Sequence, residues 1–328
     1  MAAISAPNKG GRSWFRRNRA QHTKPFGTRF IEDIKRNWSL YVMVAPVLAY
    51  FIIFQYGPMY GAQIAFRHFR PADGIWGSQW VGIQHFRDFF GSVFFWRLLR
   101  NTLRISLYRL LFEFPAPILL ALLINEVRHK YFARTIQTIT YMPFFISMIV
   151  VAGLIRTFVD QHGIITQFFG LFGMEAHNML NTINYFLPIL IVSDIWQSVG
   201  WGSIIFLAAL QGIDQEQYEA AAIDGAGRLK QTLHVTLPGI MPTIIILLIL
   251  RMGTMVSVGA EKILLLYSPL NWEVSDVIST FVYRRGLLDF QFSFASAVGL
   301  FNSVVNITFL LSANYLSRRV SQDNTSLF

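Results

Sequence analysis

The chain has 328 residues, of which 53% are hydrophobic and only 14% are charged. Soluble domains carry about 25% charged residues, so this composition excludes an ordinary water-soluble protein and predicts an integral membrane protein. The chain has no cysteine, which excludes disulfides, thiolate metal sites and cysteine nucleophiles.

The basic residues that give the chain a formal charge of +10 gather before the first apolar run. They are Lys9, Arg12, Arg16, Arg17, Arg19, Lys24, Arg29, Lys35 and Arg36. Net charge alone allows a nucleic-acid-binding arm, but a cluster beside a span is typical of a cytoplasmic tail. We therefore predict a basic tail over residues 1–38 and no nucleic-acid partner. The basic region is too long for a cleavable signal peptide.

Six segments approach the roughly 20 apolar residues that a helix needs to cross a bilayer. They are residues 39–56, 102–125, 135–159, 185–210, 239–258 and 290–316. The expected fold class is all-α, a polytopic membrane protein with about six transmembrane helices. With the basic tail inside, the inner segments carry twice as many Lys and Arg as the outer loops. This asymmetry predicts that both termini are cytoplasmic.

The first outer loop, residues 58–100, is long and rich in aromatic residues. Its aromatic side chains include Trp76, Trp80, Phe86, Phe89, Phe90, Phe94, Phe95 and Trp96. Such segments beside spans commonly lie at the level of the lipid headgroups. We expect an interfacial segment with an amphipathic helix over residues 83–95; a docking surface for an external partner is the alternative.

The inner loop, residues 211–238, has the pattern of two short helices. Asp214 can accept from the first-turn amides, and Gln217 follows at the spacing of a capping box. Residues 215–223 favour helix, and Gly225 is a left-handed stop. A second helix over residues 226–235 is expected to end before Pro238, because proline disfavours helix at the residue before it.

The first of these helices has the features of a docking element. Tyr218, Ala221 and Ala222 share one smooth face at i, i+3 and i+4 spacing. Glu216, Glu219 and Asp224 add negative charge. A membrane span needs no such insert, so we predict a partner outside the membrane. A helix lying on the membrane surface is the alternative, which the acidic residues disfavour because the inner leaflet is itself anionic.

The same loop carries a resemblance to a known family. The pattern is Glu219-Ala220-Ala221, three residues, Gly225, nine residues, Val235, one residue and Leu237-Pro238, with Asp224-Gly225-Ala226 inside it. This resembles the coupling loop of the permeases of binding-protein-dependent ABC importers, type I. Val235 and Leu233 replace the isoleucine and phenylalanine that the family often has, and both changes are conservative.

The resemblance implies a division of the chain and a set of partners. It implies a first transmembrane helix over 39–57, a permease core over 101–318 and a C-terminal tail over 319–328. The partners implied are a second, related permease subunit, a dimer of ATPase subunits and an external solute-binding protein, in a bacterial cytoplasmic membrane. The chain contains no Gly-x-x-x-x-Gly-Lys-Ser/Thr loop. We therefore expect no cofactor or catalytic residue here, with ATP and Mg²⁺ handled by the ATPase.

The resemblance also implies which residues meet the ATPase. The coupling residues are Tyr218, Glu219, Ala220, Ala221, Asp224, Gly225, Ala226, Leu237 and Pro238. Gly225 would allow the turn, and Leu237-Pro238 would set the entry into the fifth span. The external binding protein is expected on residues 57–100, 161–184 and 259–289.

The start of the chain resembles the subgroup of sugar importers that takes oligosaccharides and polysaccharide fragments. Residues 41–54, the run Tyr56–Gly61 and the run Gly82–Phe86 carry this resemblance. It implies acidic fragments such as alginate as cargo, although neutral-sugar permeases share these segments. Neutral oligosaccharides of the maltose kind therefore remain the alternative.

Charged residues within the spans agree with an acidic cargo, because intramembrane cations commonly face the bundle interior or water. An arginine there could bind a uronate carboxylate through two hydrogen bonds. Arg109 and Glu113 could instead pair with each other at i, i+4, and Arg104 and Arg156 could reach an interface. The candidate substrate path is Arg104, Arg109, Asp194, Trp196, Gln197, Trp201, Arg251, Asn302 and Asn306. Packing between helices is the alternative for its uncharged members.

Two other classes of function fit less well. An ion-coupled secondary transporter would show inverted repeats and broken midplane helices with coupling acids, and we detect neither. A membrane enzyme would need a catalytic constellation, and the seven histidines have no metal-ligand spacing. No metal site is expected.

Overall fold

The computed structural model describes residues 35–255 and 259–320, which form helices almost throughout, as the composition predicted. The predictions for the basic tail before residue 35 and for the end of the chain after residue 320 lie outside these residues. The chain divides into a first unit that ends at Gly61 and a second that begins at Ala62. The symbol η denotes 3-10 turns and wide π turns.

The first unit contains one apolar helix. Its elements are α2 (Trp38–Tyr50), η1 (Phe51–Tyr56) and α3 (Gly57–Met59), and η2 (Tyr60–Phe66) continues the helix into the second unit. The whole run Trp38–Phe66 is long and apolar enough to cross a membrane. A helix that is hydrophobic on all sides is typical of a membrane span.

The second unit opens with short elements and then long helices. They are β1 (Arg67–His68), α4 (Gly74–Gly77), β2 (Gln79–Trp80), α5 (Gln84–Phe90), α6 (Phe95–Tyr108), η3 (Arg109–Glu113), α7 (Pro115–Asn125), α8 (Lys130–Tyr141), η4 (Met142–Phe145), α9 (Met148–Phe158) and α10 (Ile164–Gly170). The two strands pair antiparallel, with Arg67 opposite Trp80.

The rest of the second unit is helical. Its elements are η5 (Met179–Asn181), α11 (Ile183–Leu210), α12 (Gln215–Ile223), α13 (Arg228–Gln231), η6 (Thr232–Thr236), α14 (Leu237–Gly253), α15 (Ala260–Leu266), α16 (Trp272–Ser275), α17 (Ile278–Tyr283), η7 (Arg284–Leu288) and α18 (Phe292–Val320).

Five helices in the described residues are long and apolar enough to span a membrane, and a bent pair makes up to six. The bent pair corrects the expected third span, residues 135–159. Helix runs over Lys130–Phe145 and Met148–Phe158, and the two parts differ in direction by 100°. Pro143 lies just before the break and Ile146 is extended. Proline lacks an N–H and crowds the carbonyl four residues earlier, which favours a break here.

Prolines also explain the wide turns inside the spans. The π turns η1, η3 and η6 end just before Pro58, Pro115 and Pro238. In η3 the amide of Phe114 donates to the Arg109 carbonyl at 3.0 Å, one residue further back than in an α-helix. A π turn absorbs the missing donor and the steric clash without ending the helix.

This accommodation corrects the expected end of the inner loop. The second short helix was expected to stop before Pro238, but helix is continuous over Arg228–Gly253. The helix that forms the fifth span therefore begins at Arg228, eleven residues before the predicted start at residue 239. The second span likewise begins earlier than residue 102, at Phe95.

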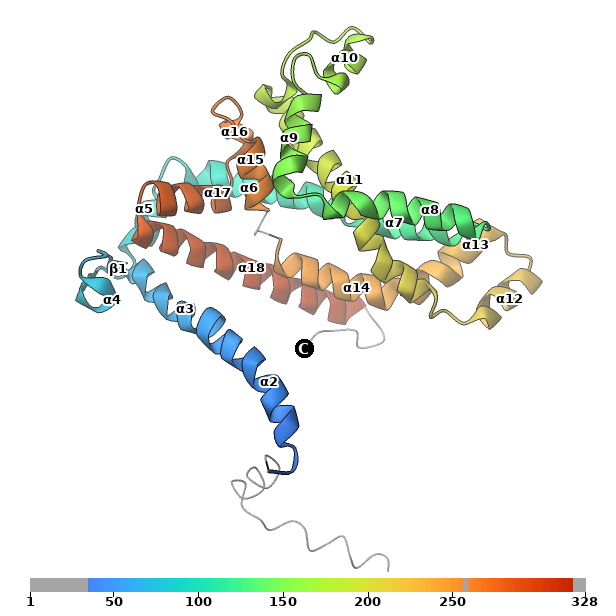
Figure 1. The fold of residues 1–328 in the computed structure, drawn as a ribbon, viewed down its shortest axis with the longest axis horizontal. Coiled ribbons are helices and arrows are strands. Elements are labelled where there is room, and N and C mark those ends of the chain that lie inside the picture. The colour runs from blue at the N-terminus through green and yellow to red at the C-terminus, as the bar shows by residue number, and fades with distance from the viewer. Residues whose placement is uncertain (1–34, 256–258, 321–328) are drawn as a thin grey trace, which may run out of the picture. The chain divides into compact units, whose positions relative to one another are not determined.

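The helix α11 organises the core of the second unit. It packs against α7, α8 and α14, and α14 in turn packs along α18 (Figure 1). At Gly200 an added Cβ would lie 2.1 Å from the Thr140 carbonyl oxygen, and at Gly202 2.9 Å from Pro117. Glycines thus bring α11 close to its neighbours, which is the usual role of small residues between membrane helices.

The first outer loop is only partly the interfacial segment that its composition predicted. Its helix α5 ends at Phe90, short of the expected residue 95. Phe89 is buried in a cluster with Phe281 and Val298, whereas Trp76 and Trp96 are exposed. Part of the loop therefore completes the core, because aromatic rings there find apolar partners on α17 and α18.

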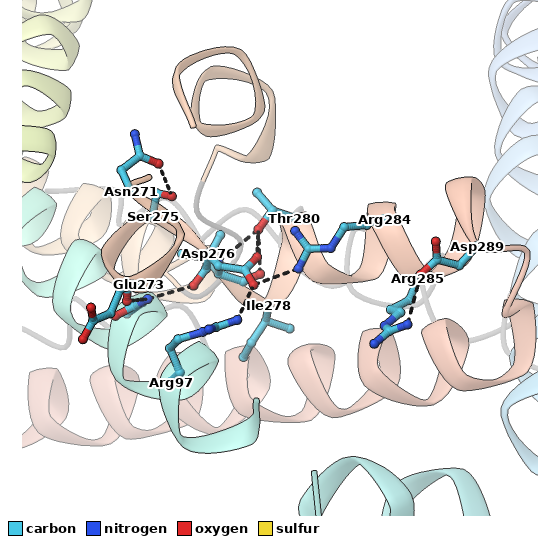
Figure 2. A network of polar contacts seen from close by, with 12 residues as sticks. Arg97, Asn271, Glu273, Ser275, Asp276, Ile278, Thr280, Arg284, Arg285 and Asp289 are labelled. Carbon is cyan, nitrogen blue, oxygen red and sulfur yellow. Dashed lines mark hydrogen bonds and ion pairs between the residues drawn. The ribbon is translucent and has the colours of Figure 1, made fainter. Parts of the chain in front are cut away.

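Residues 259–289, expected as an outer loop, form packed short helices held by one buried carboxylate. Figure 2 shows Asp276, whose side chain is fully buried, between Arg97 at 3.2 Å and Arg284 at 2.8 Å. The Thr280 hydroxyl donates to the same side chain at 2.9 Å. From α6, Asn101 donates to the Asp276 carbonyl at 3.0 Å. This segment is therefore tied to the start of the second span.

Candidate functional site

The inner loop folds as the turn chemistry predicted. Asp214 accepts from the Glu216 amide at 3.3 Å and caps α12. Gly225 has φ +75°, the left-handed conformation that favours glycine. The Ala226 amide then donates to the Ala221 carbonyl at 2.9 Å and closes the helix end. The predicted helix 215–223 and its glycine stop are confirmed.

The predicted smooth face of α12 turns toward its own chain. The Tyr218 hydroxyl donates to the Thr236 hydroxyl oxygen at 3.0 Å, and Ala221 is half-buried, whereas Ala222 is exposed. Tyr218 and Ala221 of the predicted docking face are therefore half-buried within the permease itself, and docking of a partner on this face stays a prediction. Tyr218 faces η6 because α12 folds back against that wide turn.

The exposed surface of the inner loop is made by other residues. Glu219, Ala220, Asp224, Gly225 and Pro238 are exposed, and Ala226 and Leu237 are half-buried. Two large apolar side chains that sequence reasoning passed over are also open, Ile223 at 86% exposure and Leu229 at 77%. The exposed surface of the inner loop therefore combines acidic side chains with large apolar ones.

One ion pair ties this surface to the preceding inner turn. Arg228 at the start of α13 lies 3.6 Å from Glu126, which follows α7. Both side chains are more than one-third exposed, so solvent screens the pair. The pair helps to position the inner loop, because it connects α13 to the end of α7, which precedes the bent helix pair.

A cavity of about 500 Å³ lies among α6, η3, α11 and the end of α14. Four of the predicted substrate-path residues line it together: Arg109, Asp194, Gln197 and Arg251. Polar side chains of Ser106, Glu113, Ser198 and Thr254 add to the lining. The segments come from 106 to 259 in the sequence, so tertiary folding alone creates the site.

The charged residues at this cavity form one connected set, called here the cavity network: Arg251, Glu113, Arg109, Asp194 and Lys262. Arg251 lies 2.7 Å from Glu113, and Arg109 lies 3.7 Å from Glu113. Arg109 also donates to Asp194 at 2.6 and 2.9 Å. Lys262 completes the set at 2.8 Å from Asp194. Three cations therefore meet two carboxylates, an excess of one positive charge.

The wide turn η3 positions two members of this network. It carries Arg109 at its start and Glu113 at its end, two residues before Pro115. The predicted i, i+4 pairing of Arg109 with Glu113 is confirmed, but it is the longest contact in the network. The shorter contacts of Arg109 go to Asp194 on α11 instead.

Lys262 corrects the sequence prediction, which placed it in an outer loop. Its side chain is 2% exposed, and besides Asp194 it donates to Gln197 at 3.3 Å. Burial lowers the pKa of Lys262, while the adjacent carboxylate of Asp194 opposes that lowering. A motif could not have found this residue, because packing of α15 against α9 is what buries it.

The other predicted path residues lie elsewhere. Trp201 stacks on Phe144, which lines the cavity, with ring centroids 4.6 Å apart. Arg104 and Trp196 are exposed and do not line the cavity. Asn302 and Asn306 lie on α18, and the Asn302 Oδ1 atom is buried without a hydrogen-bond partner in the described residues. Nor does the cavity touch Arg156, which donates to the Leu265 carbonyl at 2.8 Å.

Comparison with known families decides which protein family has this arrangement of spans, inner loop and cavity. Residues 113–322 match the family described as the binding-protein-dependent transport system inner membrane component. The match covers well over half of the chain. The chain belongs to this family. It is a permease subunit of an ABC importer, a membrane component that does not itself catalyse a reaction.

Relatives of known name cover nearly the whole permease. Protein LplB of Bacillus subtilis (strain 168) is 44% identical over 299 residues, which are 90% of this chain and 94% of the relative. The polygalacturonan/rhamnogalacturonan transport system permease protein YteP of the same organism is 42% identical over 286 residues, covering 87% and 89%.

Solved structures agree with the sequence relatives. A crystal structure of a bacterial ABC transporter involved in the import of the acidic polysaccharide alginate has a chain 44% identical to this permease, with a TM-score of 0.83. The match covers 90% of this permease and 100% of that chain. A second structure, of an alginate transporter in complex with a pentasaccharide-bound periplasmic protein, matches at 43% identity with the same TM-score.

No group of three or more His, Asp or Glu side chains that could hold a metal ion occurs among the residues that the structure describes.

Proposed function

We propose that this permease imports acidic oligosaccharides, the fragments of uronate-containing polysaccharides such as alginate. The observation that carries the proposal is the cavity network, with Arg109, Arg251 and Lys262 against Glu113 and Asp194. An excess cation inside a membrane protein is unfavourable unless something compensates it. The carboxylate of a uronate unit supplies that compensation.

Arg251 is the residue proposed to meet the cargo first. Its side chain is 40% exposed, whereas those of Arg109 and Lys262 are 12% and 2% exposed. A guanidinium can hold a carboxylate through two parallel N–H donors. The relatives named for alginate and for polygalacturonan transport, both acidic polymers, support this cargo class.

Coupling to ATP is proposed to run through the inner loop. The exposed residues Glu219, Ala220 and Ile223 of α12 would enter a groove of a separate ATPase subunit, which would bind ATP and Mg²⁺. The proposed assembly holds a second, related permease, two ATPase subunits and an external binding protein. Both termini of this chain would be cytoplasmic, as the distribution of Lys and Arg supports.

Transport assays with the assembled importer test the cargo class. In proteoliposomes that contain both permeases, the ATPase and the binding protein, uptake of a uronate trisaccharide is compared with that of a neutral trisaccharide. We expect preference for the acidic sugar, and Arg251→Gln should lower the acidic-to-neutral uptake ratio about tenfold. Arg156→Gln is the control, because Arg156 donates to the Leu265 carbonyl and does not line the cavity. Equal uptake of both sugars by the unaltered importer would refute the proposal.

A further inference from the structure

The contact between Arg251 and Glu113 is less complete than the rest of the cavity network. One arginine nitrogen, Nη2, lies 2.7 Å from Glu113 Oε1. The other carboxylate oxygen, Oε2, is buried and has no hydrogen-bond partner within residues 35–255 and 259–320. Buried polar atoms are nearly always hydrogen-bonded, and an unsatisfied one is unfavourable. Glu113 is therefore held at one oxygen only.

A second position for Glu113 is already adjacent. Arg109 Nε lies 3.7 Å from the unsatisfied Oε2, a little beyond hydrogen-bonding distance. Arg109 and Glu113 are both on the wide turn η3, so a small rotation of the glutamate side chain brings them together. Such a rotation withdraws the carboxylate from Arg251.

The remaining members of the network have no comparable freedom. Asp194 Oδ2 accepts from both Nε and Nη2 of Arg109, and its Oδ1 accepts from Lys262. Lys262 is 2% exposed, so no cargo can reach it without rearrangement. Of the three cations, Arg251 can therefore exchange its anionic partner with the loss of the fewest contacts.

We propose that Glu113 is an exchangeable counter-ion which a uronate carboxylate displaces from Arg251. In the unloaded permease Glu113 satisfies Arg251; on loading, the sugar carboxylate takes Arg251 and Glu113 moves to Arg109. A neutral sugar has no anion to exchange, so Glu113 does not compete with it. Glu113 therefore limits how tightly the acidic cargo is held, because it competes with the sugar carboxylate for Arg251. This inference rests on the proposed function, since it requires an acidic cargo.

The competition predicts whether a substitution of Glu113 raises or lowers the affinity for the cargo. Glu113→Gln removes the competing charge and keeps the shape of the side chain, so a uronate trisaccharide should bind about tenfold more tightly. A neutral trisaccharide should bind with unchanged affinity. Glu126→Gln is the matched control, because it is the same substitution at a glutamate that pairs with Arg228 outside the cavity.

Calorimetric titration of the purified importer without the binding protein measures these affinities directly. Tighter binding of the acidic sugar by Glu113→Gln, with no change for Glu126→Gln, supports the exchange. Unchanged or weaker binding of the acidic sugar overturns it. If Glu113→Gln does not assemble, Glu113→Asp serves instead, since the shorter side chain reaches Arg251 less well and should also tighten binding; unchanged or weaker binding then overturns the exchange.

The two proposals fail in different ways. If the unaltered importer binds acidic and neutral trisaccharides equally, the proposed cargo class fails. If the unaltered importer prefers the acidic sugar but the glutamate variants do not bind it more tightly, only the exchange fails.

Discussion

Replacing Asp194 with asparagine removes the anion that two cations of the cavity network share. Asp194 accepts from Arg109 at 2.6 and 2.9 Å and from Lys262 at 2.8 Å. Asparagine has nearly the same shape but no charge. The single amide oxygen of the asparagine can serve only one of the two cations, and the other keeps only a weak partner, the Gln197 oxygen at 3.3 Å for Lys262 or Glu113 at 3.7 Å for Arg109.

The size of the expected destabilisation follows from how deeply the three side chains are buried. Asp194, Arg109 and Lys262 are 10%, 12% and 2% exposed, so water compensates little for a lost partner. Removing one member of a buried ion pair typically costs about 3–5 kcal/mol. Lys262→Met should cost less, about 1–2 kcal/mol, because Asp194 keeps both contacts with Arg109. The double variant should be more stable than Asp194→Asn alone, because it no longer buries an unpaired ammonium.

Thermal inactivation of the purified importer in detergent ranks the three variants. Because heating of a large complex is irreversible, the order of apparent Tm values is compared rather than free energies. We expect Asp194→Asn to have the lowest value, then the double variant, with Lys262→Met nearest to the unaltered protein. A double variant less stable than Asp194→Asn would refute the shared-anion reasoning.

The stability of the Asp194→Asn variant should also depend on pH, and the direction of that dependence tests the role of Asp194 beside Lys262. Burial lowers the pKa of Lys262 and Asp194 opposes this, so the variant holds the lysine proton more weakly. Between the folded and unfolded pKa values the unfolded chain then binds more protons, and stability rises with pH. The Tm deficit of Asp194→Asn should therefore shrink as the pH rises from neutral toward the ordinary pKa of lysine. A deficit that grows over this range would contradict the assignment.

Two further substitutions test packing and the inner loop. Gly200→Ala places a Cβ 2.1 Å from the Thr140 carbonyl oxygen and should abolish the yield of folded protein in size-exclusion profiles. Gly299→Ala is the control and should leave the yield unchanged, because no atom of the described residues lies within 4 Å of the added Cβ. Normal yield of Gly200→Ala would show that α8 and α11 pack less closely. Tyr218→Phe removes the hydroxyl that bonds Thr236 at 3.0 Å and should lower cargo-stimulated ATPase activity several-fold while basal hydrolysis persists. Unchanged stimulation would show that the hydrogen bond has no role in coupling.

The inner loop could be predicted because its signals are local. Asp214 caps its own helix, and Gly225 supplies its own positive φ. These depend on residue type and spacing over a few positions. The prediction at Pro238 was wrong because the preceding wide turn absorbs the proline, and no local rule distinguishes that outcome from a helix end.

The cavity was harder to predict because its residues are distant in sequence. Arg109, Asp194 and Arg251 were singled out as intramembrane charges, and the structure brings them together. Lys262 was misplaced because its seven-residue helix α15 has no long apolar run to mark it as buried. Asn302 and Trp196 had the same residue-level signal as Gln197, yet only Gln197 lines the cavity.

By itself, the sequence determined the membrane environment, the all-α class, the helix stop at Gly225 and the family pattern of the inner loop. The first three follow from composition or from contacts within one turn of helix, and the fourth is a residue spacing along the chain that resembles a known family. Only the tertiary structure decided that the helices of the expected third span differ in direction by 100°, that Lys262 is buried and that three cations share two carboxylates. The reason is that burial and charge pairing between helices depend on which faces meet, and that depends on the packing of the whole unit.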